Sequence, residues 1–368
     1  MRYHSGLPKP EKFRIGLTPD FYTDAKGYFE GPIQEVFASV PWIEVAAIPP
    51  QPNKTATPET LNQFNALMNL AVHLTADSLK GVERLAIVAR WGVGYDRIDV
   101  AALTEANVML SITPKGVRTP VAEAILALAF ALSKNMFRLD RMTRAGGWRD
   151  SLGELTGDIR GSVLGSIGCG NIARELFRLA RPLGFSRLLA CDPFVRQGDA
   201  DDLGVELVDM DTVFRESDFV TVNTFLDDST RGLVSERQFR LMKPAAYFIN
   251  TARGPIVQHD ALVKALKENW IAGAGIDVFP AEPPPKNDPL FDLDNVIVAP
   301  HALAWTKNIW HDNGIEACGH VLKVALGEVP DNVVNPDVLR RPAFLKKLER
   351  YTGNRQQVSG PAADWPAR

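Results

Sequence analysis

Cysteine, net charge and long apolar runs are scarce in this 368-residue sequence, and each shortage excludes a class of protein. The three cysteines, Cys169, Cys191 and Cys318, are widely spaced and form no CxxC pair, which argues against a disulfide framework and favours a reducing compartment. The formal net charge is only −3, so nothing marks a nucleic-acid binder or a polybasic membrane protein. The six histidines show no metal-ligand spacing, and we therefore expect no bound metal.

Signals for secretion and membrane insertion are also missing. The opening residues, MRYHSGLPKPEKFR, contain no apolar core of the kind found in a secretory signal. The longest apolar run, 121–132, contains Glu123 and is too short to span a bilayer. These features predict a soluble, cytoplasmic protein with no membrane partner.

The length predicts two domains, because an ordinary domain contains about 150 residues. Short apolar runs alternate with helical patterns along nearly the whole chain, which favours parallel sheets covered by helices on both faces. The expected strands are 14–17, 43–48, 85–89, 108–112, 162–167, 187–190, 219–223, 246–249, 272–277 and 296–299, and the expected helices are 98–106, 172–183, 235–242 and 260–269.

Three further segments stand apart from this alternation. Residues 121–144 read as one long helix that can bridge two domains and supply an association surface, or that is simply a buried core helix. The proline-rich stretch 49–58 is expected to form an exposed loop. The tail from about Arg340 onward is expected to be a terminal appendage.

A glycine-rich turn follows the expected strand 162–167. The sequence Gly168-Cys-Gly170-Asn-Ile-Ala has the G-x-G-x-x-A arrangement, and a helix begins directly after it. Gly168 would make the tight turn and Gly170 would let a pyrophosphate approach the backbone, while the N–H groups of Asn171 and Ile172 at the helix start would face the anion. The motif alone is a weak signal, since ordinary strand–helix turns also contain glycine.

Asp192 strengthens the interpretation of this turn as a dinucleotide site. It follows the next expected strand and lies 22 residues after Gly170, close to the distance of about 20 residues expected for the acid that binds the adenosine ribose. A carboxylate there accepts both ribose hydroxyls and repels a 2′-phosphate, which favours NAD over NADP. The alternative is a turn residue before Pro193, and Arg196 leaves a smaller possibility of NADP.

Four segments, in this order along the chain, resemble the D-isomer-specific 2-hydroxyacid dehydrogenase family. They are RWGVGYDRID at 90–99, VAE at 121–123, the glycine turn with Asp192, and the run from 250 to 301 that contains NTARG, GAGIDVF, AEP and APH. The resemblance covers roughly residues 60 to 335. Each motif is modest alone, but the ordered set is specific.

The resemblance implies a catalytic set of Arg253, Glu282 and His301, which are spaced by 29 and 19 residues. The planar fork of Arg253 suits a 2-oxo acid, because it can hold the carboxylate and polarise the neighbouring carbonyl. His301 can give a proton to the developing alkoxide, and Glu282 beside it would orient the ring and favour its protonated form. Taken singly, each residue could instead be structural: a turn arginine, a loop carboxylate among prolines, and a histidine at a strand end.

Further site residues come from the same resemblance. Val93 and Gly94 would give backbone N–H groups to the substrate carboxylate, and Arg90 is similar to the arginine that phosphoglycerate dehydrogenases direct at their substrate. Arg90 could equally pair with a structural acid. The implied cofactor contacts are Asp277 at the nicotinamide amide and Thr251 and Ala252 near the nicotinamide ribose.

The implied fold is α/β, with a Rossmann NAD-binding domain inserted in a flavodoxin-like substrate domain. The substrate domain would comprise 1–120 and 301–368, the latter including the tail, and the NAD domain would comprise 121–300. The active site would lie between them, and the helix 121–144 would act as a hinge and as part of a homodimer interface.

The sequence also departs from the family. The loop 223–230 lacks the proline that the family usually has there, so its contacts with the cofactor stay open. We expect an NAD-dependent enzyme that interconverts a D-2-hydroxy acid and a 2-oxo acid. The alternatives are a formate-type dehydrogenase, against which Glu282 counts because those enzymes pair the histidine with glutamine, and an NAD-binding regulator or corepressor on the same fold.

Overall fold

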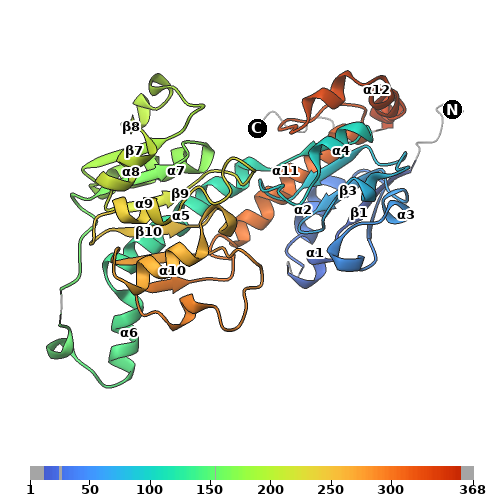
Figure 1. The fold of residues 1–368 in the computed structure, drawn as a ribbon. Helices are drawn as coiled ribbons and strands as arrows, with labels where there is room; N and C mark the ends of the chain where they lie inside the picture. The colour runs from blue at the N-terminus through green and yellow to red at the C-terminus, as the bar shows by residue number, and fades with distance from the viewer. Residues whose placement is uncertain (1–11, 25–26, 154, 358–368) are drawn as a thin grey trace, which may run out of the picture. The chain divides into compact units, whose positions relative to one another are not determined.

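The structure, a computed structural model, describes residues 12–24, 27–153 and 155–357, and the chain divides into two compact units (Figure 1). Unit 1 consists of Met1–Val117 and Lys307–Arg368, and unit 2 consists of Arg118–Thr306. From the sequence we placed these limits at 120/121 and 300/301. Each unit contains one parallel sheet with helices on both faces, so the predicted α/β fold class is confirmed.

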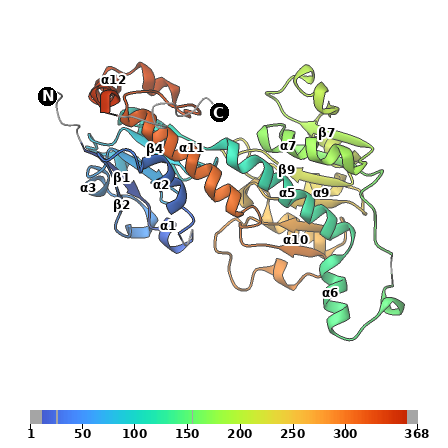
Figure 2. The same ribbon diagram turned by 180° about the vertical axis from the view of Figure 1, so that it is seen from behind.

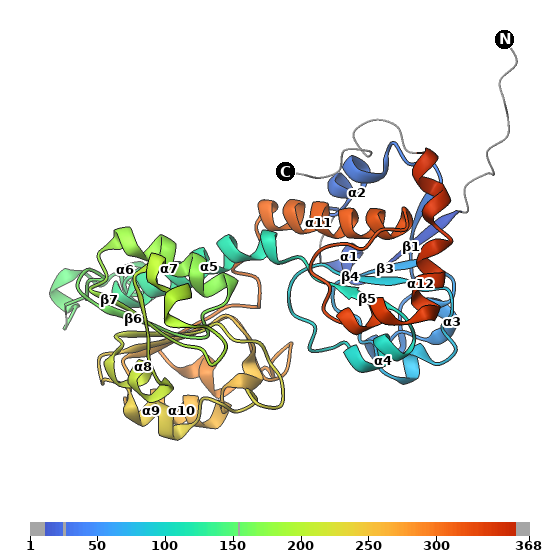
Figure 3. The ribbon, with the colours of Figure 1, turned by 90° about the horizontal axis from the view of Figure 1, so that it is seen from above.

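Unit 1 is built on a five-stranded sheet in the order β2-β1-β3-β4-β5, the flavodoxin-like order. Helices α2 and α11 cover one face of this sheet, and α3 and α4 cover the other (Figure 3). The strands are β1 (Phe13–Leu17), β2 (Ile43–Ala47), β3 (Ala66–Asn69), β4 (Ile87–Arg90) and β5 (Met109–Ser111), and the helices are α1 (Asp20–Thr23), α2 (Glu30–Phe37), α3 (Pro58–Leu61), α4 (Val100–Glu105), α11 (Lys307–Ala325) and α12 (Pro342–Glu349).

Unit 2 contains a seven-stranded sheet in the order β12-β11-β10-β9-β6-β7-β8. The chain starts at the central strand β6, builds outward to β8 and returns to β9 on the other side, which is the doubly wound Rossmann arrangement. The strands are β6 (Val163–Ile167), β7 (Arg187–Cys191), β8 (Val205–Leu207), β9 (Phe219–Val222), β10 (Tyr247–Asn250), β11 (Gly273–Ile276) and β12 (Val296–Val298), and the helices are α5 (Pro114–Ser133), α6 (Met136–Arg144), α7 (Asn171–Ala180), α8 (Met210–Glu216), α9 (Glu236–Leu241) and α10 (His259–Lys267).

Two apolar layers enclose the sheet of unit 2. Helices α8, α9 and α10 lie on the face toward the viewer in Figure 1, and α5 and α7 lie on the opposite face, toward the viewer in Figure 2. Phe214, Phe239 and Phe248 are fully buried in the first layer, and Phe177 is fully buried in the second. Because both faces are covered, the strands read as nearly continuous apolar runs.

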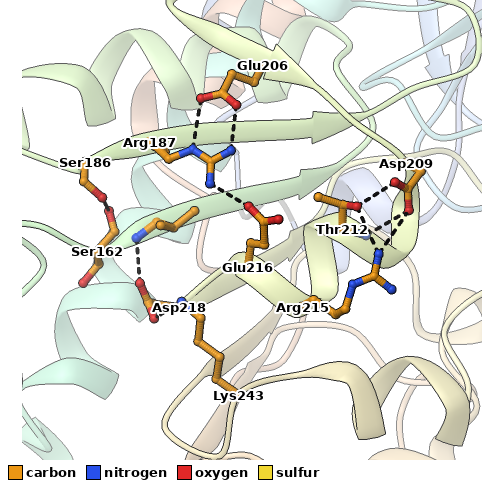
Figure 4. Close-up of polar contacts among 11 residues, drawn as sticks. Ser162, Ser186, Arg187, Glu206, Asp209, Thr212, Arg215, Glu216, Asp218 and Lys243 are labelled. Carbon is orange, nitrogen blue, oxygen red and sulfur yellow. Dashed lines mark hydrogen bonds and ion pairs between the residues drawn. The ribbon is translucent and has the colours of Figure 1, made fainter.

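Ion pairs hold the sheet of unit 2 at the amino ends of its strands (Figure 4). Arg187, the first residue of β7, bridges Glu206 and Glu216 with nitrogen–oxygen distances of 2.7 and 2.6 Å. Asp218 accepts hydrogen bonds from Lys243 Nζ at 2.7 Å and from the N–H of Val163 at 2.8 Å. The opposite, carboxyl ends of the strands are the edge at which α/β sheets bind ligands.

The predicted single helix 121–144 is wrong in two respects. The structure has two helices there, α5 and α6, and α5 begins earlier, at Pro114. The break falls at Asn135, whose φ of +48° is a left-handed conformation that asparagine tolerates better than most residues. The N–H of Asn135 donates to the carbonyl of Leu132 and closes α5.

The early start makes α5 longer than the apolar run suggested. An 18-residue window of this 20-residue helix has a mean hydropathy of 1.4, and by length and composition it is the one helix among the described residues that could cross a membrane. This is weak evidence for a membrane span, because 67% of the apolar window is buried inside the structure, as in the core helix of a soluble protein.

The expected terminal appendage is also wrong, at least as far as residue 357. Phe344, Leu348 and Tyr351 are buried against unit 1, and the Tyr351 hydroxyl accepts a hydrogen bond from Asn65 Nδ2 at 2.8 Å. Lys347 Nζ donates to three backbone carbonyls at 2.9–3.2 Å. The segment with α12 is therefore part of the core of unit 1. Residues 358–368 lie outside the described residues.

Candidate active site

The turn from β6 into α7 needs glycine at one position and leaves open space at the other. Gly168 has a φ of +100°, and a Cβ there would lie 2.6 Å from the carbonyl oxygen of Asn223. A Cβ on Gly170 would meet no heavy atom of the described residues within 4 Å. The backbone is thus accessible at Gly170, directly before the N–H groups of Asn171 and Ile172 at the start of α7. Helix N-termini of this kind bind phosphate groups.

Asp192 follows β7 and faces this turn. Its Oδ2 accepts a hydrogen bond from the N–H of Cys169 at 2.8 Å, and its Oδ1 accepts one from the N–H of Phe194 at 2.9 Å. Each carboxylate oxygen retains acceptor capacity for another donor. The side chain is half-buried at the carboxyl edge of the sheet, where a ribose hydroxyl can reach it.

His301 and Glu282 form a direct pair. His301 Nδ1 lies 2.9 Å from Glu282 Oε1 and 3.1 Å from Oε2. The side chains are 40% and 25% exposed respectively, so solvent reaches both. With Nδ1–H donating to the carboxylate, Nε2 is the ring nitrogen that is left to exchange a proton with a substrate.

Asp277 supports the backbone that carries this histidine. His301 has a φ of +56°, which is uncommon for a residue other than glycine. Asp277 Oδ1 accepts a hydrogen bond from the N–H of Ala302 at 3.1 Å, and Oδ2 accepts one from Leu303 at 3.4 Å. Burial raises the pKa of Asp277, and these backbone donors oppose the rise. Its predicted nicotinamide contact stays a prediction beside this observed structural role.

Arg253 lies on the loop after β10, within reach of the Glu282 loop. Its Nη1 donates to the carbonyl of Ala252 at 2.7 Å, and its own carbonyl accepts a hydrogen bond from Asn250 Nδ2 at 3.0 Å. A Cβ on the next residue, Gly254, would fall on the backbone of the Phe279–Pro280 segment that leads to Glu282. Glycine is therefore required for these two loops to touch.

The predicted carboxylate-binding loop lies in unit 1, after β4. Arg90 Nε donates to the carbonyl of Gly94 at 2.7 Å, and Nη1 donates to the carbonyl of Trp91. The guanidinium thus fastens the loop that carries Val93 and Gly94. The predicted contacts of these three residues with substrate stay predictions.

Sequence reasoning missed two residues that shape these loops. Thr113 Oγ1 accepts a hydrogen bond from the N–H of Gly92 at 2.7 Å, and the N–H of Thr113 donates to the Gly92 carbonyl at 3.0 Å. Asn250 accepts from the N–H of Ala252 at 3.0 Å as well as donating to Arg253. The signal for Asn250 was its place directly after the expected strand 246–249; in the structure it is the last residue of β10. Nothing in the sequence indicated Thr113, which lies 21 residues from its partner.

Comparisons with known proteins identify the family of this chain. Residues 126–302 match the model of the D-isomer specific 2-hydroxyacid dehydrogenase, NAD binding domain. A glyoxylate reductase of Korarchaeum cryptofilum is 36% identical over 299 residues, which cover 80% of this chain and 90% of that protein. A glyoxylate reductase of Thermococcus litoralis is 34% identical over 305 residues, covering 81% and 91%.

The chain belongs to the D-isomer-specific 2-hydroxyacid dehydrogenase family. A solved structure of an acyclic imino acid reductase in complex with NADPH and D-Arg shares the fold, with a TM-score of 0.77 and 24% identity over 88% of this chain and all of that one. Family membership makes the protein an NAD-dependent oxidoreductase that interconverts D-2-hydroxy acids and 2-oxo acids, which confirms the predicted enzyme class and cofactor. The regulator and formate-type alternatives are not favoured.

The residues of unit 2 fit the cofactor of this dehydrogenase family. Gly170 leaves the backbone open before the N-terminus of α7, and Asp192 retains acceptor capacity beside it. The hydroxyl of Thr251 is buried and has no hydrogen-bond partner among the described residues. A ribose or amide group of a bound nicotinamide nucleotide is the kind of partner that would satisfy it.

Proposed function

We propose that this protein reduces small 2-oxo acids such as glyoxylate with NADH, and that Arg253, Glu282 and His301 are its catalytic set. The observation that carries the proposal is the His301–Glu282 pair, whose Nδ1–Oε1 distance is 2.9 Å. The names of the curated relatives support glyoxylate as a substrate. Asp192 supports NADH over NADPH, since a carboxylate there binds ribose hydroxyls and repels a 2′-phosphate.

Each residue of the set has a distinct role in this mechanism. A dinucleotide held at the glycine turn and Asp192 would supply the hydride for the carbonyl carbon. Arg253 holds the substrate carboxylate with its planar fork and polarises the carbonyl oxygen. His301 Nε2 gives its proton to that oxygen as negative charge develops there. Glu282 accepts the hydrogen bond from Nδ1, fixes the ring orientation and stabilises the imidazolium before transfer.

The reverse reaction uses the same atoms. His301 Nε2 then takes the proton from the hydroxyl of the D-2-hydroxy acid, and the positive charge that forms on the ring is held against Glu282. Asp277 acts through the backbone: by binding the N–H groups of Ala302 and Leu303, it keeps His301 at its positive φ.

A steady-state assay of NADH consumption with a panel of 2-oxo acids tests the proposal. The panel contains glyoxylate, hydroxypyruvate, pyruvate and a bulkier aliphatic 2-oxo acid, each with NADH and with NADPH. Turnover of at least one member with NADH is expected. Failure of every member with both cofactors would contradict the proposed reaction.

We further propose that the protein is a cytoplasmic homodimer. Four large apolar side chains on or near α6 support the dimer: Phe130, Met136, Phe137 and Trp148 are 38–61% exposed. Helix α6 projects from the sheet of unit 2, as Figures 1 and 2 show. Exposed apolar surface of this kind is typical of association sites. The three free cysteines agree with a reducing compartment.

A further inference from the structure

The loop that carries Glu282, residues 280–287, is held mainly at its two ends. Its side chains are exposed or half-buried, whereas Phe279 before it and Asp288 after it are buried. The consecutive prolines at 283–285 have no N–H group, so this stretch cannot donate to a backbone ladder. The position of Glu282 therefore depends on where the two ends of the loop are fixed.

The first end of the loop is fixed near Arg253. Gly254, the residue after Arg253, touches the backbone of the Phe279–Pro280 segment and has no room for a Cβ. The N–H of Phe279 also donates to Glu282 Oε1 at 3.4 Å. This end is therefore placed by the chain that carries Arg253.

The second end of the loop is fixed by a buried carboxylate. The side chain of Asp288 is 5% exposed and that of His259 is 22% exposed. His259 Nε2 lies 3.1 Å from Asp288 Oδ1, and the same oxygen accepts a hydrogen bond from the N–H of Leu290 at 3.0 Å. An ionised carboxylate only accepts hydrogen bonds, so the ring nitrogen is the donor. The N–H of Asp288 donates to the carbonyl of Pro285 at 3.0 Å and closes the last turn of the loop.

Both members of this pair stand on core elements of unit 2. His259 is the first residue of α10, a helix whose apolar side chains are buried in the core. Leu290, two residues after Asp288, is fully buried in the same core. Between the two ends, a small cavity is lined by Pro280 of the loop and by His259 of α10, among others. Packing is incomplete there, which leaves the position of the loop to its fixed ends.

We propose that His259 is a positioning residue for Glu282. By holding Asp288 against α10, its ring fixes the far end of the loop and hence the carboxylate that faces His301 Nδ1 at 2.9 Å. Without His259, Asp288 Oδ1 would keep only the N–H of Leu290, and a buried carboxylate that lacks a partner gains by moving toward water. Glu282 would shift with the loop. The inference rests on the catalytic role of Glu282 proposed above.

Two substitutions that differ by one methylene group test this hydrogen bond. Glutamine carries its amide nitrogen about as far along the side chain as histidine carries Nε2, whereas the amide of asparagine is too short to reach Asp288. His259→Asn should therefore lower kcat for glyoxylate reduction by about 10- to 100-fold, because a displacement of about 1 Å from the productive geometry costs up to about 10²-fold. His259→Gln should retain most of the wild-type kcat.

The KM for glyoxylate separates a positioning role from a general loss of structure. Arg253, which is proposed to hold the substrate carboxylate, lies on the other loop, so this KM should change by less than about twofold in His259→Asn. The affinity for NADH, measured by fluorescence titration, should be unchanged. His311→Asn is the matched control, since it removes a histidine–carboxylate contact with Glu35 at 3.3 Å in unit 1, and it should leave kcat unchanged.

A double-mutant cycle decides whether His259 acts through Glu282. In a Glu282→Ala background, His259→Asn should lower kcat by less than about a further twofold, since the carboxylate that it positions is gone. Wild-type kcat in His259→Asn, or an equal loss with and without the Glu282 side chain, would overturn the inference and leave the proposed function intact. A wild type that reduces no 2-oxo acid, or a Glu282→Ala variant with wild-type kcat, would overturn the proposed function and the inference with it.

Discussion

Replacing Asp192 by asparagine removes the negative charge of the side chain and keeps its shape. The change therefore tests the role of that charge in the choice between NADH and NADPH. The amide oxygen can still accept one of the two backbone hydrogen bonds, from Cys169 at 2.8 Å or Phe194 at 2.9 Å. A unit charge at 4 Å from another interacts by about 1 kcal/mol in bulk water and about 4 kcal/mol at a protein surface. A 2′-phosphate facing Asp192 meets at least this repulsion, which corresponds to about 5-fold to 1,000-fold in affinity.

The ratio of kcat/KM for NADH to that for NADPH is the quantity to measure, with glyoxylate as the 2-oxo acid. It should favour NADH in the wild type and should fall at least about fivefold in Asp192→Asn. Asp202→Asn is the control, since Asp202 is exposed in the same unit, and it should leave the ratio unchanged. An equal preference for the two cofactors in the wild type, or an unchanged ratio in Asp192→Asn, would refute the reasoning.

Four other changes have defined outcomes. Glu282→Gln should lower kcat for the reduction of glyoxylate, because the His301 ring loses the carboxylate that orients it; an unchanged kcat would count against the pairing in catalysis. Arg90→Ala should lower kcat/KM for glyoxylate and for a dianionic 2-oxo acid alike and reduce the Tm, because its guanidinium binds the carbonyls of Trp91 and Gly94; a loss confined to the dianion would instead support substrate contact. Burial lowers the pKa of His320 to about 4, so between pH 6.5 and pH 4 the unfolded state binds a proton that the folded state does not. The free energy of unfolding should therefore fall by up to about 3 kcal/mol over this range. His320→Leu should reduce this pH dependence in urea titrations, and an unchanged pH dependence would contradict the prediction. Phe137→Asp should shift the mass measured by light scattering from that of a dimer to that of a monomer, and a monomeric wild type would contradict the proposed dimer.

The parts of the fold that could be predicted from sequence are those with a local signal. Buried strands such as β6 and β10 appear as short apolar runs, and the expected strands all occur within one or two residues of their predicted positions. The short strands β3 (ALMN) and β8 (VEL) escaped notice, because three or four residues give too little periodicity to distinguish a strand from a loop. Helix α11 also escaped, because glycine, asparagine and histidine interrupt its apolar pattern.

The same distinction, between features with and without a local sequence signal, holds for the site. The glycine turn follows from residue types at fixed spacings, whereas the Glu282–His301 pair follows from the family resemblance. The structure places Arg253 on a loop that touches the loop of Glu282 through Gly254. What the sequence could not reveal depends on contacts between distant residues. The break at Asn135 rests on a single positive φ. The docking of α12 rests on the burial of Phe344 and Leu348 and on hydrogen bonds between distant residues, such as that between Asn65 and Tyr351, which are 286 residues apart.

Chiral analysis of the product formed from NADH and hydroxypyruvate, by the wild type and by His301→Ala, is the most direct test of the assignment as a D-2-hydroxyacid dehydrogenase that uses His301 as its acid. The wild type should form the D-isomer of the hydroxy acid alone. His301→Ala should form the same isomer with kcat lower by about 10²–10⁴-fold, since the hydride donor remains while the general acid is lost. Formation of the L-isomer, or near-wild-type turnover by His301→Ala, would contradict the assignment.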